Sequence, residues 1–207
     1  MDVNKNTIEG LLEDATVFGT GFIPITEDQW WFAIGNEKYW KKAENNQLMI
    51  SFTAIGGTVE QNEPFIDAIY REVKEETGVD AIIYDSNKSM YIEGNSDDND
   101  KSIFHISEIR KITFAKEPRP WIVYKLYRKD DTLGVAVYKG KFSNEPYPRR
   151  EVPALLLLPP TKLLQCPKKL SSLLDTGAII REQDEPIPRE AIIYSFGSAT
   201  ILQQLLK

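Results

Sequence analysis

The chain has 207 residues, a formal net charge of −6 and a pI of about 5.0. Hydrophobic residues make up 42% of it, enough for one compact core, so we expect a single domain over residues 1–207. A binder of duplex nucleic acid would carry a basic stripe, which this acidic sequence lacks. The charge instead favours a site where a divalent cation stands between protein carboxylates and a phosphate.

The cysteine and histidine content narrows the chemistry further. Cys166 is the only cysteine and His105 the only histidine, which excludes an internal disulfide and a Cys/His zinc site. His105 lies between two apolar residues and is interpreted as an ordinary strand residue. Residues 1–30 lack a leader pattern, and no apolar run approaches about 18 residues. We therefore expect a cytoplasmic protein with no membrane partner.

The first quarter of the chain predicts a short helix followed by strands. Residues 1–15 are expected to be helical, and residues 39–47 form a polar loop or short helix. β-branched and aromatic residues predict strands over residues 16–25, 30–34 and 48–55. The polar residues between the first two strands predict a hairpin, and the third strand ends at the paired glycines 56 and 57.

A single amphipathic helix is predicted over residues 63–77. Its apolar residues recur at helical spacing, Pro64 fits the first turn, and Gly78 stands where a C-terminal cap belongs. The apolar positions are Phe65, Ile66, Ile69 and Val73. A strand over residues 79–84 is expected to follow.

The second half of the chain predicts a polar loop, more strands and a helical end. Residues 86–101 are polar enough to be an exposed loop, and residues 144–150 form a proline-containing loop. Strands are predicted over residues 122–127, 134–142 and 155–158, and helices over residues 161–165, 168–174 and 198–206. The order favours an α+β fold, with a mixed sheet covered by helices and a C-terminal helical extension over about residues 160–207.

Three glutamates on the predicted helix are candidates for chemistry. Glu72, Glu75 and Glu76 follow i, i+3, i+4 spacing and therefore share one helix face. Carboxylates that converge in this way suit magnesium or manganese, which prefer hard oxygen ligands. Taken alone, the same pattern describes a solvated acidic face, since glutamate is a common helix former.

The surrounding segment decides between these interpretations. Residues 57–79 have the sequence GTVEQNEPFIDAIYREVKEETGV, which matches the Nudix box without a gap. The matching residues are Gly57, Glu63, Arg71, Glu72, Val73, Glu75, Glu76, Gly78 and Val79. The chain thus resembles the Nudix hydrolases, which implies an α/β/α sandwich with a mixed β-sheet and a catalytic loop-helix-loop.

The resemblance implies roles for individual residues. Glu72, Glu75 and Glu76 correspond to the glutamates that bind Mg²⁺ or Mn²⁺ and carry catalysis, and the carbonyl of Gly57 is an implied further ligand. An alternative role for Glu72, activation of the attacking water, stays open.

Outside the metal ligands, the resemblance implies that Glu63 and Arg71 form a structural ion pair between loop and helix. Many relatives recruit one more acidic residue from outside the box. The candidates here are Glu145 and Glu151, with Glu108 and Glu117 as further ones.

The implied reaction is attack of water on the diphosphate linkage of a nucleoside diphosphate derivative or nucleoside triphosphate. The box does not identify the substrate, and markers of known subfamilies are missing. Aromatic residues of the first hairpin are assigned either to base stacking or to the core: Trp30, Trp31, Phe32 and Trp40.

Two other functions stay open, as does a homodimer. One is a non-catalytic Nudix-fold module that binds a nucleotide or another ligand for regulation. The other is different chemistry on the same fold, such as isomerisation, for which Cys166 is a poor candidate.

Overall fold

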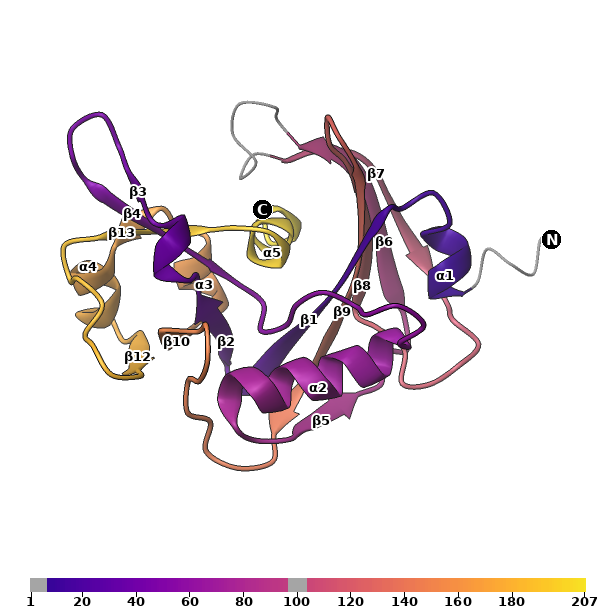
Figure 1. The fold of residues 1–207 in the computed structure, drawn as a ribbon, viewed down its shortest axis with the longest axis horizontal. Helices are drawn as coiled ribbons and strands as arrows, with labels where there is room; N and C mark the ends of the chain where they lie inside the picture. Colours follow the sequence, from indigo (N-terminus) through magenta and orange to yellow (C-terminus); the bar gives the residue numbers. More distant parts are fainter. Residues whose placement is uncertain (1–6, 97–103) are drawn as a thin grey trace.

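The computed structural model describes residues 7–96 and 104–207 (Figure 1). Within it, β1 (Val17–Thr26) lies in the middle of the sheet and joins the strands on its two sides. Most of β1 runs parallel to β9 (Thr132–Phe142). Only its last two residues pair with β2 (Gln29–Ile34), which confirms the predicted hairpin but limits it to a short contact. Beyond this turn the two strands separate into different parts of the sheet.

The strands form one mixed sheet in the described residues. Its main path runs in the order β11-β13-β4-β2-β1-β9-β8-β6-β7. The strands on this path not yet named are β4 (Leu48–Thr53), β6 (Ser89–Ser96), β7 (Phe104–Ile112), β8 (Ile122–Tyr127), β11 (Lys168–Lys169) and β13 (Ile192–Ser195). Beside it lie β3 (Lys41–Lys42), β5 (Ala81–Tyr84), β10 (Ala154–Leu158) and β12 (Ile179–Glu182).

Helices pack on opposite faces of β1. Because side chains alternate along a strand, Phe22 points into the core that contains α2 (Phe65–Thr77), and Ile23 points into the core that contains α5 (Ser198–Leu205). In Figure 1, α2 lies below β1 and α5 above it. The remaining helices are short: α1 (Ile8–Leu11), η2 (Glu37–Tyr39), α3 (Pro160–Leu163) and α4 (Leu170–Leu174). The α+β class and the layered arrangement are therefore confirmed.

α2 has the boundaries that its end residues impose. It begins after Pro64 and ends at Gly78, whose left-handed φ of 73° suits a glycine cap. Ile69 and Val73 are fully buried and fix the apolar face against the sheet. The opposite face is thereby held at the surface of the sheet layer.

Three predictions about secondary structure were wrong. Residues 89–96 of the predicted loop form β6, and residues 97–101 of that loop lie outside the described residues. His105 lies in β7, as its interpretation as a strand residue predicted, but the rest of β7 was missed because five successive residues of the strand are exposed and mostly polar. The C-terminal region is also not purely helical, since β13 pairs in parallel with β4 and β12 pairs with β10. These strands are short, and only pairing with distant residues stabilises them.

The N-terminal helix is shorter than predicted over the described residues. It spans only Ile8–Leu11, and residues 1–6 lie outside the description. No helix in residues 7–96 and 104–207 is long and apolar enough to cross a membrane.

Candidate active site

The glycine loop after β4 is fixed against β1. The Thr20 N–H donates to the Gly57 carbonyl at 2.9 Å, and the Phe22 N–H donates to the Ile55 carbonyl at 2.6 Å. Gly56 has a φ of 143°, and a Cβ added there would lie 2.3 Å from the Thr20 carbonyl oxygen. Only glycine fits this position, both for backbone conformation and for space.

Two glutamates of α2 face this loop. The Gly56 N–H donates to Glu76 Oε2 at 2.9 Å. Glu72 lies against the neighbouring glycine, because a Cβ added to Gly57 would be 2.6 Å from Glu72 Oε1. The carboxylates of Glu72 and Glu76 are thus held beside the backbone of the loop, as the shared helix face predicted.

Arg71 ties the start of the loop to the helix. Its Nε and Nη2 donate to the two carboxylate oxygens of Glu63 at 2.9 and 2.8 Å, and Nη2 also donates to the Thr58 carbonyl at 3.1 Å. The hydrogen bonds from Arg71 lower the pKa of Glu63 to about 2, and the carboxylate in turn raises the pKa of the guanidinium. The geometry agrees with the structural ion pair that the sequence implied.

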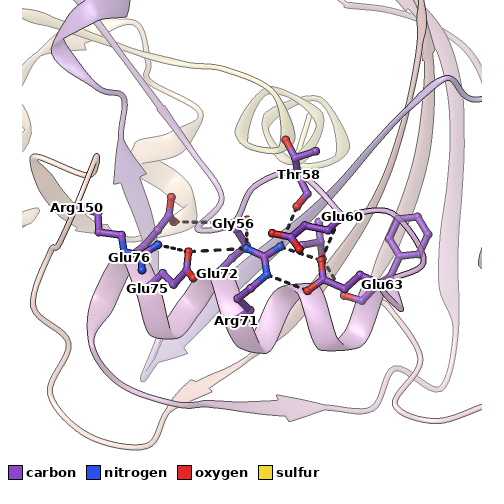
Figure 2. A network of polar contacts seen from close by, with 11 residues as sticks. Gly56, Thr58, Glu60, Glu63, Arg71, Glu72, Glu75, Glu76 and Arg150 are labelled. Atoms are coloured by element: carbon purple, nitrogen blue, oxygen red, sulfur yellow. Dashed lines mark hydrogen bonds and ion pairs between the residues drawn. The ribbon is translucent and has the colours of Figure 1, made fainter.

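Arginines also neutralise Glu72 and Glu75. Arg71 Nη1 donates to Glu72 Oε1 at 2.7 Å and lies 3.8 Å from Glu75 Oε2. Arg150, from the loop between β9 and β10, forms an ion pair with the same Glu75 oxygen. Figure 2 shows the Glu75 carboxylate between the two guanidinium groups. Sequence reasoning missed Arg150, for which the only signal was a pair of arginines in a proline-containing loop.

Glu76 is the carboxyl group with the most unusual acidity in the site. Burial raises its pKa to about 8, and the nearby charges of Glu72, Glu151 and Glu75 act in the same direction. The hydrogen bond from the Gly56 N–H opposes this effect. Several negative groups therefore lie close together, a situation that a cation would relieve.

The two additional acidic candidates occupy different surroundings. Glu151 lies close enough for its charge to raise the pKa of Glu76, and its carboxylate pairs with Lys38 Nζ at 3.0 Å. Glu145 instead pairs with Arg181 of β12. The position of Glu151 therefore fits an added ligand or base better than that of Glu145.

The carboxylate and carbonyl oxygens of the site are suitable ligands for a divalent cation, but the carboxylates already contact other groups of the protein. Among the described residues, no group of three or more Asp, Glu, His or Cys side chains is placed to hold a metal ion. Glu72 and Glu75 instead pair with arginines. The Gly57 carbonyl accepts one hydrogen bond and keeps a second lone pair. A cation would replace the arginines as partner of these carboxylates.

The aromatic residues near the first hairpin serve packing in this structure. Trp31 and Phe32 are buried, and the Trp31 Nε1–H donates to Thr26 Oγ1 at 3.0 Å. Trp30 packs edge-on against Trp121. These contacts favour the core assignment over base stacking.

Cys166 is buried, which raises the pKa of its thiol to about 12.

Comparison with known proteins gives one family match and several solved structures of low sequence identity. The family model described as NUDIX domain matches residues 29–125, and no curated protein matches. A MutT NUDIX hydrolase from Burkholderia pseudomallei is 14% identical with a TM-score of 0.43, and the match covers 92% of this chain and 98% of the other. A NUDIX-family hydrolase from Clostridium perfringens has 14% identity, the same coverages and a TM-score of 0.41. The E. coli ORF135 protein has 15% identity and a TM-score of 0.45, with 72% and 77% covered.

The matched segment contains the parts of the site that face one another. It includes the glycine loop, the Glu63–Arg71 pair and the three glutamates of α2, all in the spacing of the box. Residues 29–125 therefore carry a NUDIX domain, which supports a Nudix-type hydrolase.

Proposed function

We propose that the protein is a metal-dependent pyrophosphohydrolase that cleaves the diphosphate linkage of a nucleoside diphosphate derivative or a nucleoside triphosphate. One observation supports this most directly: the carboxylates of Glu72 and Glu76 meet the backbone of Gly56 and Gly57. Carboxylates beside a tight glycine loop offer hard ligands for a cation and space for a phosphate to approach the backbone.

Glu72, Glu75 and Glu76 would hold Mg²⁺ or Mn²⁺, with the Gly57 carbonyl as a further ligand. When bound, such a cation supplies charge neutralisation at the phosphate oxygens and lowers the pKa of a bound water. The carboxylate that accepts the proton from the attacking water is assigned to Glu72 or Glu151. Glu151 is preferred to Glu145 because it lies within electrostatic reach of Glu76.

Glu63 and Arg71 position the site without touching the reacting atoms. Their paired hydrogen bonds, together with the bond from Arg71 to the Thr58 carbonyl, hold the loop on the helix. A fixed loop keeps the glycine backbone where the substrate must lie, which lowers the entropic cost of positioning the substrate.

A second candidate function is a binding module without turnover. The observation that favours it is the neutralisation of Glu72 and Glu75 by arginines, which leaves the acidic face stable with no cation. A nucleotide or related ligand would then bind for regulation.

Turnover of a substrate panel distinguishes the two. Nucleotide sugars, dinucleotides and nucleoside triphosphates are incubated with Mg²⁺ or Mn²⁺, and wild type is compared with Glu76→Gln. We expect wild type to hydrolyse at least one substrate and Glu76→Gln to lose about a hundredfold or more of the rate, since a neutral amide is a poor metal ligand.

Asp67→Asn is the matched control. It removes a carboxylate from the exposed surface of the same helix and is expected to keep the wild-type rate. Unchanged turnover in Glu76→Gln would contradict the metal assignment. Tight binding of one compound without turnover by wild type would favour the binding module.

A further inference from the structure

The loop between β9 and β10 is fastened to the end of α2. The Arg149 N–H donates to the Glu76 carbonyl at 2.8 Å, and the Tyr147 N–H donates to the Thr77 carbonyl at 3.0 Å. These carbonyls belong to the last turn of the helix and have no partner within it. The backbone that leads into Arg150 is therefore held in place next to the box glutamates.

Arg150 itself adopts a backbone conformation that is costly for its residue type. Its φ is 52°, in the left-handed region, which is unfavourable for a residue with a Cβ. The turn is closed by a hydrogen bond from the Val152 N–H to the Arg149 carbonyl at 3.1 Å. Such conformations in residues other than glycine gather at functional sites, because the surrounding structure must enforce them. Here the result is a guanidinium group directed at Glu75.

The two arginines beside Glu75 differ in how firmly they are held. Arg71 is fixed by Glu63 and by the Thr58 carbonyl, whatever Glu75 does. The side chain of Arg150 is 61% exposed, and Glu75 is its ion-pair partner in the described part of the chain. If the Glu75 carboxylate turns to a cation, Arg71 keeps its partners and the Arg150 guanidinium becomes available.

We propose that Arg150 is a phosphate-binding residue of the site, with Glu75 as its partner only while no cation is bound. The inference rests on the proposed function, because it requires a cation on the box glutamates. A guanidinium group presents parallel N–H donors that match two phosphate oxygens. Its charge would also offset the negative charge that a diphosphate brings next to Glu72, Glu76 and Glu151.

The proposal predicts that loss of Arg150 weakens the binding of a diphosphate analogue but does not weaken the binding of Mn²⁺. Mn²⁺ binding is measured without substrate, by the electron paramagnetic resonance signal of the free ion. Binding of methylenediphosphonate, a diphosphate analogue that cannot be hydrolysed, is measured by calorimetry in saturating Mn²⁺. In Arg150→Gln we expect Mn²⁺ to bind equally well or about two- to fivefold more tightly, since a competing cation is gone. The diphosphonate should bind about tenfold more weakly or worse.

Arg149→Gln is the control, because it removes the same charge one position away. The Arg149 guanidinium lies over Gly78 and contacts no box glutamate in the described residues, so both affinities should stay within about twofold of wild type.

Three outcomes would overturn the proposal. Wild-type diphosphonate affinity in Arg150→Gln, with Mn²⁺ binding intact, would overturn it and leave the proposed function standing. Weaker Mn²⁺ binding in Arg150→Gln would make Arg150 a structural support of the site. Absence of Mn²⁺ binding in wild type would overturn the proposed function, and this inference with it.

Discussion

At the scale of single residues, arginines determine how the acidic face of α2 is arranged. Arg71 binds both oxygens of Glu63 and one oxygen of Glu72, so the face is neutralised from within the box. Arg150 neutralises Glu75 from a loop about 75 residues further along the chain. The first arrangement joins residues within one short segment of the chain, whereas the second requires a distant loop to fold back onto the end of α2.

The Glu63–Arg71 pair makes stability depend on pH in a defined window. The pKa of Glu63 falls from an ordinary 4.5 to about 2 in the folded protein, so its stabilising effect is complete above pH 4.5 and is lost as pH falls toward 2. We expect Glu63→Gln to lower the free energy of unfolding at pH 7 by roughly 1 to 3 kcal/mol. The loss should shrink below pH 4.5, as measured by urea denaturation at pH 7, 4 and 3.

A neighbouring glutamate provides the control for this prediction. The side chain of Glu60 is exposed, and Glu60→Gln should change stability little at any of these pH values. An equal loss at pH 7 and pH 3 in Glu63→Gln would show that charge is not the source of the stabilisation.

At the scale of elements, the loop between β4 and α2 is as important as the helix. Gly56 and Gly57 look equivalent in the sequence but meet different neighbours. A Cβ at Gly56 would strike the backbone of Thr20, whereas one at Gly57 would strike the end of the Glu72 side chain. The Thr20 backbone cannot easily move to make room for an added Cβ, whereas the Glu72 carboxylate can rotate away from it.

The two glycines therefore predict different losses on substitution by alanine. Gly56→Ala should destabilise the fold by about 2 kcal/mol or more, because of both its φ and the clash with β1. Gly57→Ala should cost less stability but weaken Mn²⁺ binding about tenfold or more, since it displaces Glu72. Thermal unfolding and Mn²⁺ titration of both variants test this, and equal stability losses would contradict it.

At the scale of the whole molecule, the C-terminal region completes the core. Ile201 and Leu202 of α5 are buried with Ile23 of β1, and β13 extends the sheet beside β4. Gln203 holds the region together, since its amide donates to the carbonyls of Leu163 and Cys166. The single domain over residues 1–207 stays a prediction that these contacts support.

Truncation tests that prediction directly. A chain ending at residue 159 would expose the apolar face of β1 and β4 that α5 covers, and we expect it not to fold cooperatively. The full chain should unfold in one transition, measured by circular dichroism and calorimetry. A cooperative transition in the truncated chain would show that residues 160–207 form a separate unit.

The loop, the helix and the resemblance to the Nudix hydrolases were all predictable from local sequence. Gly57, Glu63, Arg71 and the three glutamates lie within one continuous segment, so fixed spacing and the 3.6-residue period place them together without knowledge of the rest. Strands rich in β-branched and aromatic residues, such as β8, were also predictable.

The surroundings of that segment depend on how the whole chain folds. The placement of Arg150 and Glu151 beside α2 depends on backbone bonds between the end of the helix and a distant loop. β13 exists because β4 offers it a parallel partner, which four residues in a proline-rich region do not reveal. Contacts between residues far apart in the chain produce no periodic pattern in the sequence, so these pairings could not be predicted from the sequence alone.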